Sequence, residues 1–221
     1  MQLRADFARR EVVRPEDEAW RPSPSPGVDR RMLDRIGNEV ARATSIVRYA
    51  PNTRFSAHAH DGGEEFLVLE GTFADEHGAY PQGTYVRNPV GTSHSPTVGS
   101  KGCTILVKLY QFDPEDQTQT VIDTRSSDWI EGTDPGLRLL PLHKFKSERV
   151  ALVHLEPNTR LDPREFRGGE EILVLEGAFR DEFGCYPEGT WIRSPHLFKH
   201  ALFTETVNAL LYVKTGHLPE N

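Results

Sequence analysis

Residues 51–94, PNTRFSAHAHDGGEEFLVLEGTFADEHGAYPQGTYVRNPVGTSH, return at residues 157–200 as PNTRLDPREFRGGEEILVLEGAFRDEFGCYPEGTWIRSPHLFKH. The offset is 106 positions throughout, without a gap, and 24 of the 44 aligned residues are identical. Further upstream, Trp20 matches Trp129 at an offset of 109, so the copies differ there by three residues in length. Self-similarity of this extent indicates an internal duplication. The chain therefore contains two copies of one unit of about 90 residues.

Each copy is made of short segments that favour β-strands. In the first copy these are ATSIVRYA, EEFLVLEG, GTYVRNP and CTILVKLY, which carry β-branched and aromatic residues and end at turn-forming residues. Spacings of about 10–15 residues suit antiparallel strands in a sandwich or barrel. Helical periodicity is weak; its best case is residues 6–20, where Pro15 interrupts it. The sequence predicts an all-β fold.

The duplication divides the chain into four parts. We expect an N-terminal arm at residues 1–19, a first domain at 20–112, a linker at 113–128 and a second domain at 129–221. The linker is polar and rich in turn formers, and within it Val121 and Ile122 are expected to add an edge strand.

Composition excludes several classes of protein. The 221 residues carry a formal net charge of −7 without a Lys/Arg cluster, which argues against nucleic acid or an anionic membrane as partner. The mean hydropathy is −0.54, and no apolar run approaches the ~20 residues of a membrane span. The N-terminal residues lack the apolar segment of a signal peptide, so we expect a cytoplasmic protein. Two distant cysteines exclude a disulfide framework.

The first copy contains a set of metal-binding residue types. His58 and His60 are two positions apart, so on a strand both imidazoles face one side of the sheet. Of the adjacent Glu64 and Glu65, only one can share that side, and the spacing favours Glu64. A later segment with turn-forming residues delivers His94. Imidazoles with a carboxylate suit a divalent first-row metal ion.

These residues resemble the two sequence motifs of the cupin superfamily. HxH-x3-E-x6-G matches His58, His60, Glu64 and Gly71, and G-x5-P-x-G-x2-H matches a segment from Gly83 to His94, with Val98 in place of the usual closing Asn. More narrowly, both copies resemble the cupin-like domain of ChrR-type anti-sigma factors. The resemblance implies two tandem cupin barrels (double-stranded β-helix, or jelly-roll), and in the first a metal ion held by His58, His60, Glu64 and His94.

The second copy has lost half of this ligand set. Arg164 and Phe166 stand where His58 and His60 stand in the first copy, whereas Glu170 and His200 remain. We therefore expect one divalent metal per chain. One hypothesis is that the Arg164 guanidinium balances the charge of Glu170 while Phe166 fills the vacated volume. The alternative is that Arg164 points to solvent.

The resemblance implies a sensory or regulatory role related to anti-sigma factors. The His-x3-Cys-x2-Cys motif of the sigma-binding helical domain does not occur, which argues against sigma-factor binding. We expect the metal to be zinc. Iron, manganese and nickel remain alternatives, because the same donors bind all four ions.

The alternative function is a metal-dependent dioxygenase that acts on a small diketone or hydroxyketone, since such enzymes have a similar cupin-like domain. A small-molecule ligand is compatible with either function. A third possibility is a storage or interaction fold. Cupin proteins commonly form dimers, so the resemblance leads us to expect a homodimer.

Overall fold

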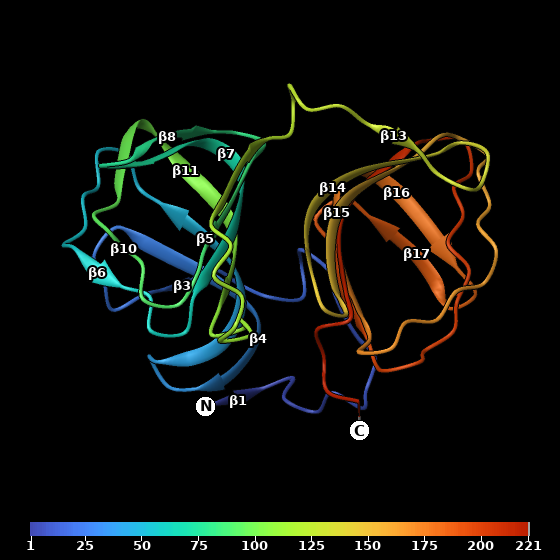
Figure 1. Ribbon diagram of the computed structural model, residues 1–221, viewed down its shortest axis with the longest axis horizontal. Coiled ribbons are helices and arrows are strands. Elements are labelled where there is room, and N and C mark those ends of the chain that lie inside the picture. Colours follow the sequence, from blue (N-terminus) through green and yellow to red (C-terminus); the bar gives the residue numbers. More distant parts are fainter. Residues whose placement is uncertain (221) are drawn as a thin grey trace. The chain divides into compact units, whose positions relative to one another are not determined.

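The computed structural model describes residues 1–220 and is built from β-strands (Figure 1). In this part of the chain there is no α-helix, so none is long and apolar enough to cross a membrane. The predicted all-β fold is confirmed. The chain forms two compact units: unit 1 comprises Met1–Ala5 and Glu18–Ser127, and unit 2 comprises Asp6–Asp17 and the chain from Asp128 onward. Residue 221, the last of the predicted second domain, lies outside the described residues.

Unit 1 contains one large antiparallel sheet and one small ribbon. The order in the sheet is β1-β4-β5-β11-β7-β9-β12, with β3 paired to β4 and β8 paired to β7, while β6 and β10 pair only with each other. The bounds are β1 (Gln2–Leu3), β3 (Arg21–Pro22), β4 (Val28–Gly37), β5 (Ala41–Tyr49), β6 (His58–Ala59), β7 (Glu64–Asp75), β8 (Gly78–Pro81), β9 (Thr84–Asn88), β10 (Ser93–His94), β11 (Thr97–Leu109) and β12 (Thr120–Asp123).

Unit 2 repeats the central part of this topology, without counterparts of β1 and of the β6-β10 ribbon among the described residues. Its sheet order is β13-β14-β15-β19-β16-β18-β2, with β17 paired to β16. The run β14-β15-β19-β16-β18 thus corresponds to β4-β5-β11-β7-β9 of unit 1. The bounds are β2 (Glu11–Val13), β13 (Ile130–Glu131), β14 (Leu137–Phe145), β15 (Glu148–Leu155), β16 (Glu170–Asp181), β17 (Gly184–Pro187), β18 (Trp191–Ser194) and β19 (Ala209–Thr215).

The two cores consist of matching residues. In unit 1, Phe66 and Val68 on β7 alternate with Glu65 and Leu67, which lie on the opposite face of the sheet, so both point into the core. Their counterparts 106 positions later, Ile172 and Val174 on β16, occupy the core of unit 2. All four are 1% exposed, and burial of side chains of this size stabilises a fold by about 1.5–3 kcal/mol each. The two copies in the sequence therefore share the pattern of buried hydrophobic residues that forms the core of each unit.

The last strand of each sheet comes from the segment that precedes the other unit in the sequence. The predicted edge strand around Val121 and Ile122 is confirmed as β12, which pairs with β9 in unit 1. β2 pairs with β18 in unit 2, with Val13 opposite Trp191. The arm therefore contains a strand, in the segment where the sequence shows its best but weak helical periodicity. Residues 6–17 belong to unit 2 and most of the expected linker belongs to unit 1.

Equivalent buried arginines hold these exchanged segments. Arg87 on β9 pairs with Glu65 and with Asp116 of the segment that leads to β12, each at 2.7 Å, and all three side chains are at most 1% exposed. Arg193 on β18 donates to the carbonyl oxygen of Asp6 (3.0 Å), and its guanidinium stacks over Phe7 of the arm at 4.5 Å. In each unit, one buried cation thus fixes a segment distant in sequence.

Candidate metal centre

Three histidines of unit 1 converge beside the small ribbon. His58 on β6 lies directly opposite His94 on β10, and His60 follows two residues after His58. The ring centroids lie 5.1 Å apart for His58 and His60, 4.9 Å for His58 and His94, and 4.7 Å for His60 and His94. One ligand nitrogen from each ring lies within 4.8 Å of the others, so the three could hold one metal ion.

Glu64, the first residue of β7, faces these rings. Its Oε2 lies 3.4 Å from Nε2 of His60 and 3.7 Å from Nε2 of His94. The carboxyl is buried, and this burial raises its pKa to about 7, although a hydrogen bond from Asn88 opposes the shift. Glu65 points to the opposite side of the strand and binds Arg87. A carboxylate buried among imidazoles fits a site that is completed by a cation.

The state of the imidazoles tests whether a metal fits. Nε2 of His60 and Nε2 of His94 are buried and have no hydrogen-bond partner among residues 1–220. Burial, followed by the neighbouring His94 and His58, lowers the pKa of His60 to about 4, and burial also lowers the pKa of His94. Both rings are therefore neutral, and their unpartnered Nε2 atoms face Glu64. An orphaned buried nitrogen is costly unless something binds it, and a divalent metal ion would do so.

Two further contacts orient the rings. His94 donates from Nδ1 to Oδ2 of Asp75 at 3.1 Å, and His58 donates from Nδ1 to the carbonyl oxygen of Ser56 at 3.1 Å. Each bond leaves Nε2 as the lone-pair nitrogen, which is the usual arrangement of metal-bound histidines. Sequence reasoning did not identify Asp75. The signal was present, because Asp181 occupies the same position in the second copy.

The four side chains line a cavity of about 730 Å³. Its walls include apolar side chains such as Phe55, Phe73 and Val107, and Arg30 and Arg54 also line it. His58 is exposed, whereas His60 and His94 are buried, so the cluster is reached from the side of His58. A molecule of small or moderate size can therefore approach the cluster from solvent.

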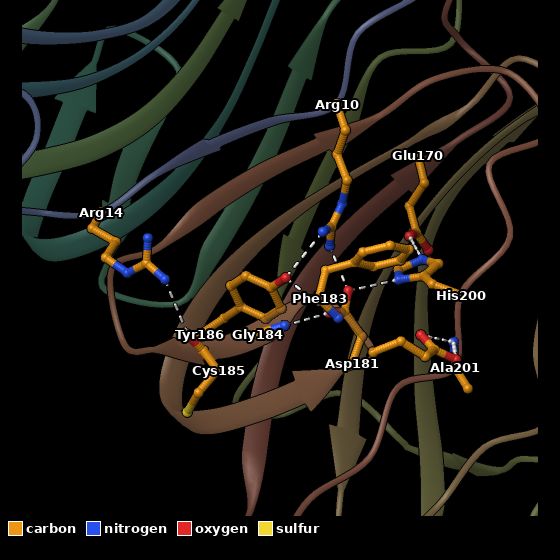
Figure 2. Close-up of polar contacts among 11 residues, drawn as sticks. Arg10, Arg14, Glu170, Asp181, Phe183, Gly184, Cys185, Tyr186, His200 and Ala201 are labelled. Atoms are coloured by element: carbon orange, nitrogen blue, oxygen red, sulfur yellow. Dashed lines mark hydrogen bonds and ion pairs between the residues drawn. The ribbon is translucent and has the colours of Figure 1, made fainter.

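At the corresponding position in unit 2, the charged side chains pair with one another. His200 donates from Nε2 to Oε2 of Glu170 at 2.8 Å and from Nδ1 to Oδ2 of Asp181 at 3.2 Å (Figure 2). Arg164 instead forms an ion pair with Asp134. The hypothesis that Arg164 balances Glu170 is therefore wrong. His200 is the cation beside Glu170, because its ring reaches the carboxylate directly whereas Arg164 lies closer to the surface.

Arg10 of the arm completes this arrangement. Its guanidinium forms an ion pair with Asp181 and donates to the hydroxyl of Tyr186 at 3.0 Å (Figure 2). It also stacks near the rings of Phe183 and Phe198. Burial alone would raise the pKa of Asp181, but hydrogen bonds from His200, Phe183 and Tyr186, together with Arg10, lower it. Burial likewise opposes protonation of His200, yet Asp181 and Glu170 raise its pKa to about 9. The two carboxylates are thus balanced by two cations.

Arg10→Ala is expected to destabilise unit 2 by about 3 kcal/mol, because it leaves the fully buried Asp181 with one cation fewer. Hydrogen exchange should show lost protection in β16 and β18, with β7 and β9 of unit 1 unchanged. Arg14→Ala is the matched control, since the Arg14 side chain makes only a 3.4 Å hydrogen bond to the carbonyl oxygen of Cys185. Equal loss of protection in both units would contradict the assignment of Arg10 to unit 2.

Both repeats match a family model described as the ChrR cupin-like domain, over residues 8–113 and 117–219. The chain belongs to this family. The predicted resemblance is confirmed, and it extends over both copies, including the one whose histidine pair is replaced. No match is found among curated protein sequences.

Solved structures of the same fold include several that cover most of this ChrR cupin-like chain. A candidate dioxygenase from Nostoc punctiforme has 16% sequence identity and a TM-score of 0.78, covering 97% of this chain and 85% of that one. A candidate glyoxylate-induced protein from Pseudomonas aeruginosa has 14% identity and a TM-score of 0.76, covering 96% and 91%. Oxalate decarboxylase from Bacillus subtilis, whose Mn(II) centres have been studied, has 14% identity and a TM-score of 0.64, covering 95% and 78%. These likenesses support tandem cupin barrels.

Proposed function

We propose that unit 1 binds one divalent metal ion through His58, His60, Glu64 and His94. The observation that carries this proposal is the pair of buried, unpartnered Nε2 atoms of His60 and His94 that face the buried Glu64. Asp75 and the carbonyl of Ser56 hold His94 and His58, respectively, in the required tautomer. A bound ion would supply Lewis-acid polarisation to an oxygen-bearing ligand in the cavity.

We further propose a sensory or regulatory role, which is supported by the positions of the donors. His58 and His94 stand on the two-stranded ribbon β6-β10, which has no strand pairing to the main sheet, whereas Glu64 begins β7 of that sheet. An ion shared by these residues would fasten the ribbon to the sheet. Whether a metal ion is bound would then determine how well ordered this exposed edge of unit 1 is. A partner could detect that change in order. Zinc suits this role, because three imidazoles and one carboxylate complete its tetrahedral coordination.

A second candidate function, a dioxygenase that acts on a small diketone or hydroxyketone, is favoured by the cavity of about 730 Å³ beside the cluster. Arg30 and Arg54 would attract the oxygen atoms of such a substrate, and Phe55 and Phe73 would exclude water from it. An iron ion held by the same four residues would be required. The similar candidate dioxygenase from Nostoc punctiforme is consistent with this function.

Metal analysis separates the two candidates. Protein purified without added metal is expected to contain about one equivalent of zinc per chain. When the chain is fully loaded with iron instead, we expect no oxygen consumption with a panel of β-diketones and hydroxyketones. Iron as the native metal, together with oxygen uptake that depends on one of these substrates, would replace the regulatory proposal by the dioxygenase. Absence of any tightly bound metal would overturn both.

A further inference from the structure

Unit 2 retains a cavity at the place where unit 1 has its metal-binding pocket. The cavity has a volume of about 240 Å³, and its walls are mainly apolar, with Val153, Leu161 and Leu202 among them. Val153 corresponds to Val47, which lines the pocket of unit 1. Phe166 reduces the space without filling it, contrary to the expectation that it would occupy the vacated volume. A recess of this size accepts a molecule of about one aromatic ring.

The inner end of this cavity presents one hydrogen-bond acceptor. Glu170 lines the cavity and is 5% exposed, and its Oε2 accepts the hydrogen bond from His200. No described residue donates to Oε1 of Glu170. Both ring nitrogens of His200 are occupied, by Glu170 and by Asp181 (Figure 2). A carboxylate oxygen that lines a cavity and receives no hydrogen bond from the described residues is an acceptor to which a ligand hydroxyl can donate.

The charges around the acceptor exclude charged ligands. His200 is held protonated and balances Glu170, and Arg10 balances Asp181, so the inner end carries no excess charge. An ammonium group would find no uncompensated anion, and a carboxylate would be repelled by Glu170. Arg149 and Asp162 line the exposed part of the cavity and carry opposite charges, and Arg164, which also lines it, is paired with Asp134. The apolar walls and the single acceptor together suit a neutral molecule with one donor.

We propose that the cavity of unit 2 is a metal-independent binding site for a small apolar molecule with one hydroxyl group, such as a phenol. The apolar body lies against Val153, Leu161 and Leu202, and the hydroxyl donates to Oε1 of Glu170. The site does not depend on the metal proposed for unit 1. The duplication would thereby have produced two different sites: one for a metal ion, and one in which a His–Glu pair replaces the metal.

Calorimetric titration of the full chain with p-cresol tests the proposal. The protein is first treated with EDTA, so that no metal in unit 1 contributes. We expect one site, and at least about tenfold weaker binding of toluene, which lacks the hydroxyl. Benzoate and benzylamine are also expected to bind at least about tenfold more weakly. No binding of p-cresol, or equal affinities for p-cresol and toluene, would overturn the proposal.

Matched variants locate the site. Val153→Phe narrows the cavity of unit 2 and should weaken p-cresol binding at least about tenfold. Val47→Phe makes the same change in unit 1 and should leave the affinity unchanged. If Val153→Phe fails to fold, Leu139→Arg serves instead: Leu139 lines the cavity, and Arg30 stands at the equivalent position of unit 1. Loss of binding in Val47→Phe alone would assign p-cresol to unit 1 and refute the proposal.

Discussion

His60→Ala is expected to reduce bound metal from about one equivalent per chain to less than about 0.1 after dialysis. The lone pair of His60 Nε2 is buried, has no hydrogen-bond partner and lies 3.4 Å from Oε2 of Glu64. Alanine removes one of four donors and leaves only an apolar methyl group in its place. A three-donor remnant would hold the ion far more weakly, because each ligand contributes several kcal/mol to the affinity. Elemental analysis of the dialysed protein measures the change.

His77→Ala is the matched control for this prediction. His77 is exposed in the turn between β7 and β8, and it is absent from the three-histidine cluster. Its replacement should leave the metal content at about one equivalent. Hydrogen exchange on His60→Ala should show that β7 and β11 remain protected, so that loss of metal is separated from loss of fold. Retention of a full equivalent by folded His60→Ala would contradict the proposed centre.

The sequence predicts the barrels well because the fold is decided by a pattern that occurs twice. Phe66 and Ile172 differ in type but lie at the same place in the repeat, and both are buried in their cores. Alternation along a strand places such residues on one side. The same alternation separates Glu64 from Glu65 and brings His58 and His60 to one side. These are local consequences of strand geometry, so they are visible before any tertiary contact is known.

Contacts between segments distant in sequence could not be predicted in this way. β2 is a strand of three residues in a segment with weak helical periodicity, and nothing local indicates that Trp191 and its neighbours on β18 are its partners. Arg10 and Asp181 are separated by 171 positions, and Arg164 and Glu170 by only six, yet Arg10 forms the ion pair with a buried carboxylate of the second site. Which charged groups pair depends on the directions that long side chains take in the folded protein. For Glu170, proximity in the sequence favoured Arg164, whereas the cation beside it is His200.

The double variant Arg164→His with Phe166→His is expected to raise bound metal from about one to about two equivalents per chain. The backbone of unit 2 already places these positions correctly: Arg164 is bridged to His200 as His58 is to His94. Leu197 holds a left-handed conformation (φ 56°), as does Gly91 at the same position in unit 1 (φ 89°). The two new imidazoles would join Glu170 and His200 in a second set of three nitrogens and one carboxylate.

Binding of that second ion requires His200 to release the proton that it donates to Glu170, so the new site should be weaker than the native one and more sensitive to acid. Elemental analysis and metal titration with a chromophoric competitor give the stoichiometry and the two affinities. Arg164→Ala with Phe166→Ala is the control, because it removes the same side chains without adding donors, and it should retain one equivalent. If the histidine variant folds and still binds only one ion, the pairing of Arg10, Asp181, His200 and Glu170 excludes metal more strongly than the missing histidines do. The absence of metal binding in the second copy would then be due mainly to the charge pairs among these four residues.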